Sequence, residues 1–155
     1  MISEELTAFI ESGVSILVGT RDHANRPYGM RGVGVRASAD RKSLTVLLPD
    51  ATGKRALADV RDNGRVAFTF TRPIDHRSIQ LKGAVTSVRA ATDEERRQAE
   101  KYIDDWAGHV EVVGLPRALG SRLACWPSTA VTVRIESVFH QTPGPSAGAR
   151  VTGNP

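Results

Sequence analysis

The chain has 155 residues and a formal net charge of +4, from 21 basic and 17 acidic residues. A chain of this length forms one domain, or one domain with a tail, whose core needs no metal ion. Its single cysteine, Cys125, excludes an intramolecular disulfide and a cysteine-rich zinc site. The mild positive charge favours anionic ligands without requiring a nucleic acid. Because no apolar run approaches the ~18 residues of a membrane span and no secretory signal is visible, we expect a cytoplasmic protein with no membrane partner.

The first half of the chain predicts a short helix followed by closely spaced strands. Ser3 can cap that helix, and acidic residues lie in its first turn, where the helix dipole favours negative charge. Gly29, Gly32 and Gly34 fall within the second β-rich run, where they weaken a strand but let another backbone or a flat ligand approach closely. The expected elements are a helix over 4–12 and strands over 14–20, 27–37 and 44–48.

The second half predicts further helices and strands. Thr52 can cap a helix that Asn63 and Gly64 end. Thr92 and Glu95 form a capping box that begins another helix, whose apolar residues share one face. The expected elements are helices over 52–62 and 92–107, a weaker helix or pair of turns over 115–123, and strands over 65–71, 78–89 and 130–140.

These elements predict a mainly β architecture of the α+β class. Six short strands at close spacing, with three small helices between them, favour an antiparallel barrel over a parallel βαβ sheet. We expect residues 1–141 to form a single domain. Residues 142–155 are rich in glycine and proline, so we expect a tail that becomes ordered only by docking.

The stretch from Asp50 to Arg55 joins a predicted strand to the start of a helix. Such a junction offers free backbone N–H groups, the positive end of the helix dipole, the hydroxyl of Thr52 and the cations of Lys54 and Arg55 within one turn. A phosphate monoester is the natural ligand of this set. The alternative interpretation is a capped helix with two solvated bases.

A second polar stretch lies along the strand predicted over 78–89. Alternation places Ser78, Gln80 and Lys82 on one face and Ile79 and Leu81 on the other. A row of hydroxyl, amide and ammonium groups suits the polar edge of a heterocycle. The alternative interpretation is an exposed sheet face.

The motifs and predicted elements occur in an order that resembles one known family over about residues 6–150. It consists of P-x-x-x-R at 27–31, the Thr and Lys-Arg helix start, N-G-R-V at 63–66 and S-I-Q-L-K-G at 78–83. The chain resembles the FMN-binding split-barrel family of pyridoxamine 5'-phosphate oxidase-like proteins. The resemblance implies a six-stranded antiparallel split β-barrel with short peripheral helices. It also implies a homodimer with a flavin mononucleotide (FMN) in each of two interface grooves and the tail partly docked near the cofactor.

The resemblance also implies which residues contact the cofactor. The segment from Arg31 to Arg36 would lie along the flavin ring, the residues near Thr52 would bind the phosphate, and His140 falls where the oxidase has a tryptophan. That replacement, and the lack of an Arg-His pair after Arg150, argue against pyridoxamine phosphate oxidase activity itself. The implied cofactor-binding residues are Arg31, Val33, Gly34, Val35, Leu47, Leu48, Thr52, Lys54, Arg55, Ser78, Gln80, His140 and Arg150.

The function implied is a flavin-dependent oxidoreductase that transfers a hydride or electrons to a small-molecule substrate, which the sequence does not identify. The cofactor carries such chemistry, so we assign no catalytic side chain and no metal ligand. The same family includes deazaflavin (F420) reductases and haem-binding members. An F420-dependent reductase and a non-enzymatic flavin- or haem-binding module, with His140 as axial ligand, therefore remain alternatives. A nucleic-acid partner is not expected, because single-stranded binding uses aromatic platforms and aromatic residues make up only 5% of the chain.

Overall fold

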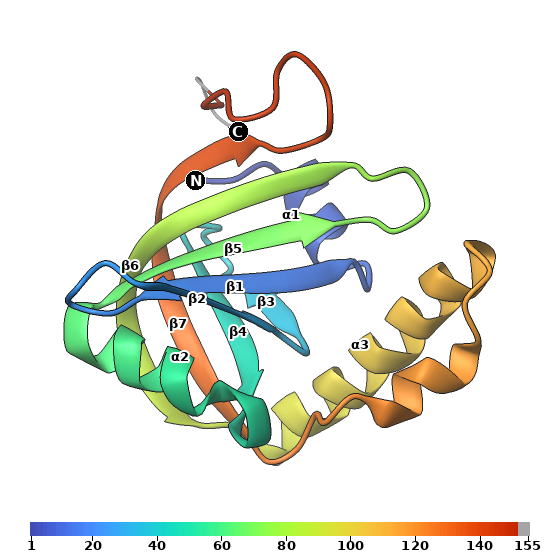
Figure 1. Ribbon diagram of the computed structural model, residues 1–155, viewed down its shortest axis with the longest axis horizontal. Coiled ribbons are helices and arrows are strands. Elements are labelled where there is room, and N and C mark those ends of the chain that lie inside the picture. Colours follow the sequence, from blue (N-terminus) through green and yellow to red (C-terminus); the bar gives the residue numbers. More distant parts are fainter. Residues whose placement is uncertain (152–155) are drawn as a thin grey trace.

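Within residues 1–151, the protein is built around one antiparallel sheet of seven strands, in the order β2-β1-β5-β6-β7-β4-β3. The computed structural model describes residues 1–151. Its strands are β1 (Ser15–Arg21), β2 (Pro27–Arg31), β3 (Val35–Ala37), β4 (Ser43–Pro49), β5 (Arg65–Thr71), β6 (Ser78–Ala90) and β7 (Ser128–His140) (Figure 1). Its helices are α1 (Glu4–Ile10), α2 (Asp50–Asn63), α3 (Asp93–Val112) and the 3-10 helix η1 (Arg117–Arg122). The mainly β, antiparallel class is confirmed, whereas the predicted count of six strands is wrong.

The difference arises because the strand predicted over 27–37 is two strands at opposite edges of the sheet. A link of three residues, Gly32 to Gly34, separates β2 from β3. The N–H of Gly32 donates to Ile16 O in β1 at 3.0 Å, and the next N–H, of Val33, donates to Leu47 O in β4 at 2.9 Å. The chain thus passes from the edge strand β2 to the opposite edge strand β3 through this short link. The two edges must therefore lie close together, which means that the sheet is strongly curled.

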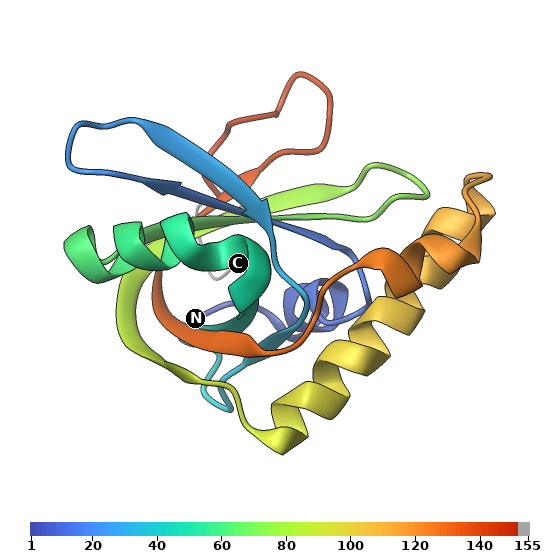
Figure 2. The ribbon, with the colours of Figure 1, turned by 60° about the horizontal axis from the view of Figure 1, so that its bottom comes forward.

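Alternation along the strands sends apolar side chains to the inside of this curl. In β1 Ile16 and Val18 are at most 1% exposed, and in β5 Phe68 and Phe70 are equally buried. The helices add their own apolar faces, and α2 packs beneath the β1–β2 hairpin (Figure 2). None of the described helices is both long and apolar enough to span a membrane.

The helix boundaries follow their predicted caps with one exception. Ser3 Oγ accepts from Leu6 N, and the Thr92 capping box begins α3, which runs on to Val112 rather than ending near 107. Thr52 does not cap α2, which begins at Asp50 with no side-chain cap. The reason lies in the residue just before β7, because Pro127 O accepts from Asp50 N–H at 3.0 Å and fixes the helix start two residues earlier.

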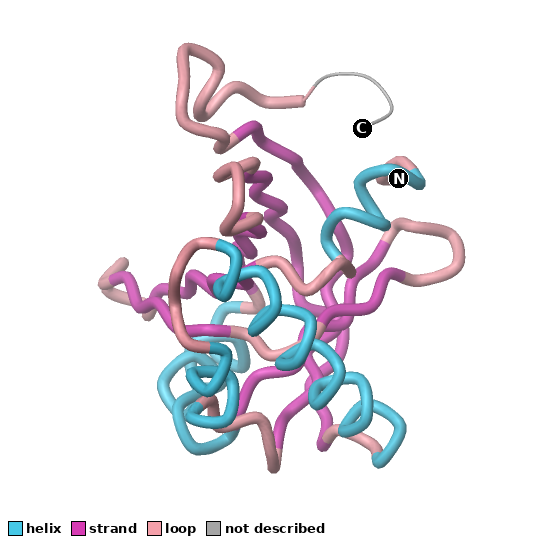
Figure 3. Tube along the Cα trace, turned by 90° about the vertical axis from the view of Figure 1, so that its right-hand side faces the viewer, coloured by secondary structure: helices cyan, strands magenta, loops and turns pink. Residues whose placement is uncertain are grey.

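The chain after β7 turns back and lies along that strand. Arg150 pairs with Phe139 in an antiparallel bridge. His140 N–H donates to Ala149 O, and Val151 N–H donates to Val138 O, both at 2.9 Å. This C-terminal segment stands at the end of the molecule opposite α2 and α3 (Figure 3). Residues 152–155 of the predicted tail lie outside the described residues.

The close approach of β6 and β7 at Gly83 gives a test of the fold. A Cβ at Gly83 would lie 2.0 Å from the backbone oxygen of Arg134, whereas one at Gly29 would meet nothing within 4 Å. We expect Gly83→Ala to lower the free energy of unfolding by about 3 kcal/mol, since overpacking costs of this order are typical when backbone must move. Gly29→Ala should change it by less than about 0.5 kcal/mol. Urea unfolding of both variants measures the difference, and equal losses would contradict the described register.

Candidate functional site

One row of side chains crosses the outer face of the curled sheet. Its members lie opposite one another in the strand register, from β2 through β1, β5, β6 and β7 to the C-terminal segment. On β1, β5 and β6 the sequence neighbours of the row's members are buried, so these side chains face outward. Six chain segments spaced ~4.8 Å apart put about 24 Å between the ends of the row. The outer row consists of Arg31, Leu17, Thr69, Gln80, Phe139 and Arg150.

Beside the outer row, three small residues form the floor of a hollow. Gly29 lies opposite Gly19, and Gly19 lies opposite Ala67. Cavities of about 380 Å³ and about 500 Å³ open over Gly19 and Ala67, within the size range of small-molecule sites. Leu17 forms part of the wall and is 50% exposed. We name this hollow the trough; its missing side chains let a flat ligand lie close to the backbone.

Cations line the trough on both sides. Arg31 and Lys82 have no carboxylate partner among residues 1–151, whereas Arg65 pairs with Glu136. The ammonium of Lys82 lies 4.8 Å from the centre of the Phe139 ring. An anionic or carbonyl-bearing ligand in the trough would therefore meet unpaired positive charge.

A second cationic site stands at the start of α2, next to the edge strand β2. The guanidinium of Arg55 lies 4.9 Å from the centre of the Tyr28 ring, and the Tyr28 hydroxyl donates to Thr52 O at 3.2 Å. Lys54 and Arg55 are exposed and form no ion pair in the described chain. Thr52, Lys54 and Arg55 are thus together at the positive end of a 14-residue helix, the arrangement that binds phosphate groups.

The segment that the resemblance places along a flavin ring is closed in this structure. Val33, Val35, Leu47 and Leu48 are at most 4% exposed, because their side chains complete the core. The link residue Gly34 accepts from Leu47 N–H through its carbonyl. The structure therefore does not bring these five predicted residues to the trough.

The polar groups at the outward side of β3 are also occupied, by two side chains from the helical parts of the chain. Gln98 Nε2 of α3 donates to Val35 O at 2.6 Å, and Ala37 N–H donates to Glu11 Oε1 at 2.8 Å. This strand offers little free backbone to a ligand.

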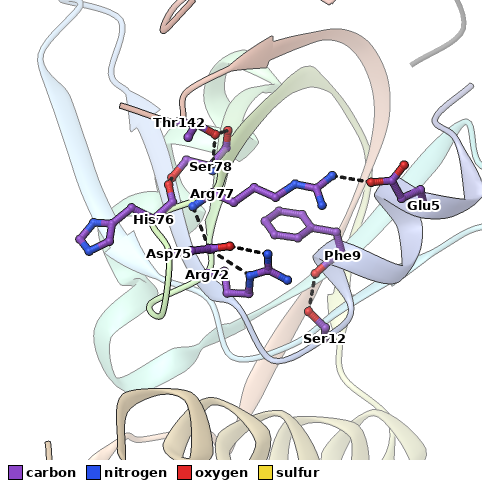
Figure 4. Close-up of polar contacts among 9 residues, drawn as sticks. All are labelled: Glu5, Phe9, Ser12, Arg72, Asp75, His76, Arg77, Ser78 and Thr142. Atoms are coloured by element: carbon purple, nitrogen blue, oxygen red, sulfur yellow. Dashed lines mark hydrogen bonds and ion pairs between the residues drawn. The ribbon is translucent and has the colours of Figure 1, made fainter. Parts of the chain in front are cut away.

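Ser78 is buried and hydrogen-bonded within the fold rather than exposed to a ligand. It is 5% exposed, its hydroxyl donates to His76 O at 2.9 Å, and its oxygen lies 2.9 Å from Thr71 Oγ1. Its N–H donates to Thr142 Oγ1 at 2.9 Å, which fastens the C-terminal segment to the start of β6 (Figure 4). The Ser78 hydroxyl is therefore already satisfied within the fold.

The β5–β6 turn beside Ser78 holds α1 in place. The ring of Phe9 has the Arg77 guanidinium 4.7 Å away and that of Arg72 5.9 Å away, and Arg77 pairs with Glu5 at 2.8 Å (Figure 4). We name this group the Phe9 clamp. The Arg72 guanidinium, helped by the N–H of Arg77, lowers the pKa of Asp75 to about 2.

The predicted site residues thus fall into three groups. Arg31, Gln80 and Arg150 share the outer row, with exposed His140 next to Phe139, while the Lys54 group stands at α2 and the remainder are buried. Sequence reasoning identified Gly29 as a close-approach position but missed Gly19 and Ala67, which complete the trough floor. The signal was present as alternation in β1 and β5, where small residues occupy outward positions, but it acquires meaning only once the strand register is known.

Comparison with solved structures identifies the fold. HupZ from Group A Streptococcus is 18% identical over 96% of this chain and 100% of its own, with a TM-score of 0.59. An F420 reductase is 13% identical over 88% and 98%, with a TM-score of 0.57. A pyridoxamine 5'-phosphate oxidase-related, FMN-binding protein from Nostoc punctiforme is 13% identical over 86% and 77%, with a TM-score of 0.50.

The chain has the fold of the pyridoxamine 5'-phosphate oxidase-like FMN-binding proteins. HutZ, described as a haem storage protein from Vibrio cholerae, shares this fold at 14% identity over 90% of this chain and 95% of its own, with a TM-score of 0.51. In sequence alone, neither a protein-family model nor a curated protein matches the chain. The resemblance drawn from the motifs is confirmed at the level of the fold.

The Phe9 clamp gives a pH-dependent prediction. The folded pKa of Asp75, about 2, lies below its usual 3.8, so its contribution to stability is complete above that usual value and is lost as the pH falls through about 2. Asp75→Asn removes this contribution. We expect the variant to be less stable than the wild type at pH 7, with the gap closing between pH 4 and pH 2.

Urea unfolding at several pH values measures that gap. Asp62→Asn, at an exposed aspartate of α2 outside the clamp, is the control. A gap that stays constant down to pH 2 would show that the carboxylate of Asp75 does not stabilise the clamp.

Proposed function

We propose that this protein is an oxidoreductase in which two copies bind FMN between their outer sheet faces. FMN would be the cofactor for a reaction on a small-molecule substrate. The observation that carries the proposal is the outer row, which has a cation at each end and polar residues at its centre. The similar structures described above as FMN-binding support the cofactor. The remaining argument comes from the charges and shape of this chain.

The phosphate of the cofactor fits the start of α2. Lys54 and Arg55 would each give a charge-assisted hydrogen bond, and the helix dipole adds to their attraction. Asp50, the acidic residue of this first turn, accepts from the Thr129 hydroxyl at 2.8 Å. That hydrogen bond directs the carboxylate toward β7, and within residues 1–151 Asp50 forms no ion pair with Lys54 or Arg55.

The flat ring of the cofactor fits the trough. Its floor of two glycines and an alanine permits close approach, and Leu17 supplies an exposed apolar wall. Gln80 donates to Thr69 Oγ1 at 3.0 Å, which holds its amide in the outer row. The trough is shallow and open on one side, so a second surface is needed to exclude water from a ring lying there.

A second copy of the chain supplies that surface. Consider a two-fold axis parallel to the strands that passes between Thr69 and Gln80. Leu17 then faces the partner's Phe139, Thr69 faces the partner's Gln80, and apolar and polar groups are matched across an isologous contact. Arg31 faces the partner's Arg150 at both ends of the row. Two curled faces touch at their centres and diverge at their ends, so a groove remains at each end of the row. Each groove contains two cations, Arg31 of one copy and Arg150 of the other, and these charges favour an anionic ligand.

FMN in these grooves would supply the hydride or electron transfer chemistry. The chain would bind its phosphate, orient its ring over the trough and exclude water through the partner. The unpaired cations of Arg31 and Lys82 would stabilise negative charge on the bound ligand. F420 and haem would meet the same trough, and the visible spectrum of the purified protein separates flavin bands, a deazaflavin band and a Soret band.

The phosphate site is tested by comparing FMN with riboflavin, which lacks the phosphate. Lys54→Ala with Arg55→Ala should weaken FMN binding by roughly 100-fold, because each charge-assisted hydrogen bond is worth roughly 1.5–3 kcal/mol and 1.4 kcal/mol is a factor of ten. Riboflavin binding should not change. Arg96→Ala with Arg97→Ala, which removes two adjacent bases of α3, should leave both affinities unchanged. Fluorescence titration measures all four, and an unchanged FMN preference would remove the α2 start from the site.

The dimer is tested with two leucines of similar exposure. Leu17 on the outer row is 50% exposed, and Leu115 beyond α3 is 46% exposed. We expect light scattering at micromolar concentration, with FMN present, to give a dimer for the wild type and for Leu115→Lys and a monomer for Leu17→Lys. The ammonium introduced at position 17 would be buried opposite the unpaired Arg31, and both its desolvation and the like-charge repulsion are costly. A monomeric wild type would refute the face-to-face arrangement.

A further inference from the structure

Arg31 carries a charge that nothing in the described chain neutralises. Its Nε is buried and has no hydrogen-bond partner, and no carboxylate forms an ion pair with its guanidinium within residues 1–151. Its Nη2 lies 3.5 Å from Ser15 Oγ, a long contact. Buried polar groups are normally satisfied, and an exception calls for an explanation.

A tryptophan of α3 packs against this guanidinium. The guanidinium carbon lies 4.6 Å from the centre of the Trp106 ring, and Trp106 is 7% exposed. Trp106 Nε1–H donates to Ser15 Oγ at 3.0 Å, so the indole is itself held to β1. A guanidinium stacked on an aromatic face keeps its fork of donors free for a planar acceptor.

The neighbouring ionisable groups do not supply the missing counter-charge. Burial raises the pKa of Tyr102 to about 12, so its hydroxyl is neutral near pH 7, where it donates to Val14 O at 2.9 Å. Asp105, which precedes Trp106, forms an ion pair with Lys101. A negatively charged group of a ligand can therefore supply the counter-charge of Arg31.

We propose that Trp106 is the positioning residue of the trough and that Arg31, held in place over its ring, receives the anionic or carbonyl-bearing edge of a planar ligand. This inference rests on the proposed function, because Arg31 lines the same trough. It gives α3 a role in binding. The apolar face of that helix covers the core, and its Trp106 also holds the Arg31 guanidinium in position before the ligand binds. Preset donors cost little to order on binding.

The inference is tested by FMN affinity in a double-mutant cycle. Arg31→Lys and Trp106→Leu should each weaken FMN binding about tenfold, and Ser15→Ala, which frees the indole without removing it, about threefold. Because Trp106 acts through Arg31, the double variant Arg31→Lys/Trp106→Leu should bind no more weakly than Arg31→Lys alone. A tryptophan that only fills the core would give additive losses, and that result would overturn the assignment.

A matched Arg–Trp pair elsewhere serves as the control. Arg96 lies 5.7 Å over the ring of Trp126 and is not part of the trough. Trp126→Leu and Arg96→Lys should leave FMN affinity within twofold of the wild type. If Trp106→Leu binds FMN as tightly as these controls, the positioning role is refuted while the proposed function stands.

A ligand-free measurement tests the stack independently of the cofactor. In nuclear magnetic resonance spectra of the wild type without cofactor, the Nε–H proton of Arg31 should be shifted upfield by the indole ring and should exchange slowly with water. Ser15→Ala should reduce both effects, and Trp106→Leu should abolish them. A wild type that fails to bind FMN would overturn the proposed function, whereas absence of the upfield shift would overturn the role of Trp106.

Discussion

The arrangement of the whole sheet depends on a close approach at Gly32, where the chain passes between Ile16 of β1 and Val46 of β4. An added Cβ there would lie 2.9 Å from the Ile16 side chain and 3.0 Å from that of Val46. The missing side chain lets these two strands come together across the chain. Their approach brings opposite edges of the sheet to the two ends of a three-residue link, and the resulting curl separates a closed inner face from an outer face that bends away.

The same strands therefore perform two tasks on their two faces. Inside, Ile16, Phe68 and Phe70 are almost fully buried, and removal of apolar surface from water stabilises the fold. Outside, Gly19 and Ala67 contribute little packing, which would weaken an isolated strand. The inner face compensates for that weakness, so the outer positions are free to carry residues chosen for contact with a ligand or a second subunit.

Local features of this fold could be predicted from the sequence, and long-range ones could not. The caps at Ser3 and Thr92 depend on residues within one turn, and the pattern alone identified them. The outer row pairs Gln80 with Phe139, far apart in the chain, and no local pattern fixes that register. The chemistry of the strand-to-helix junction identified Lys54 and Arg55 directly, whereas the family resemblance supplied Arg31 and Arg150. The floor residues Gly19 and Ala67 went unrecognised because their contribution is the absence of large side chains on one face, and that face is defined only by the strand register.

The edge strand β3 has a consequence for how copies of this protein can associate. Its outward carbonyl, of Val35, and its outward N–H, of Ala37, are bonded to Gln98 and Glu11. Together these two side chains imitate an adjacent strand. An unpaired strand edge is a template for sheet growth from one molecule to the next. Here Gln98 and Glu11 of the same molecule already occupy these backbone groups. Another molecule therefore cannot add a strand at β3, and open-ended association through this edge is prevented.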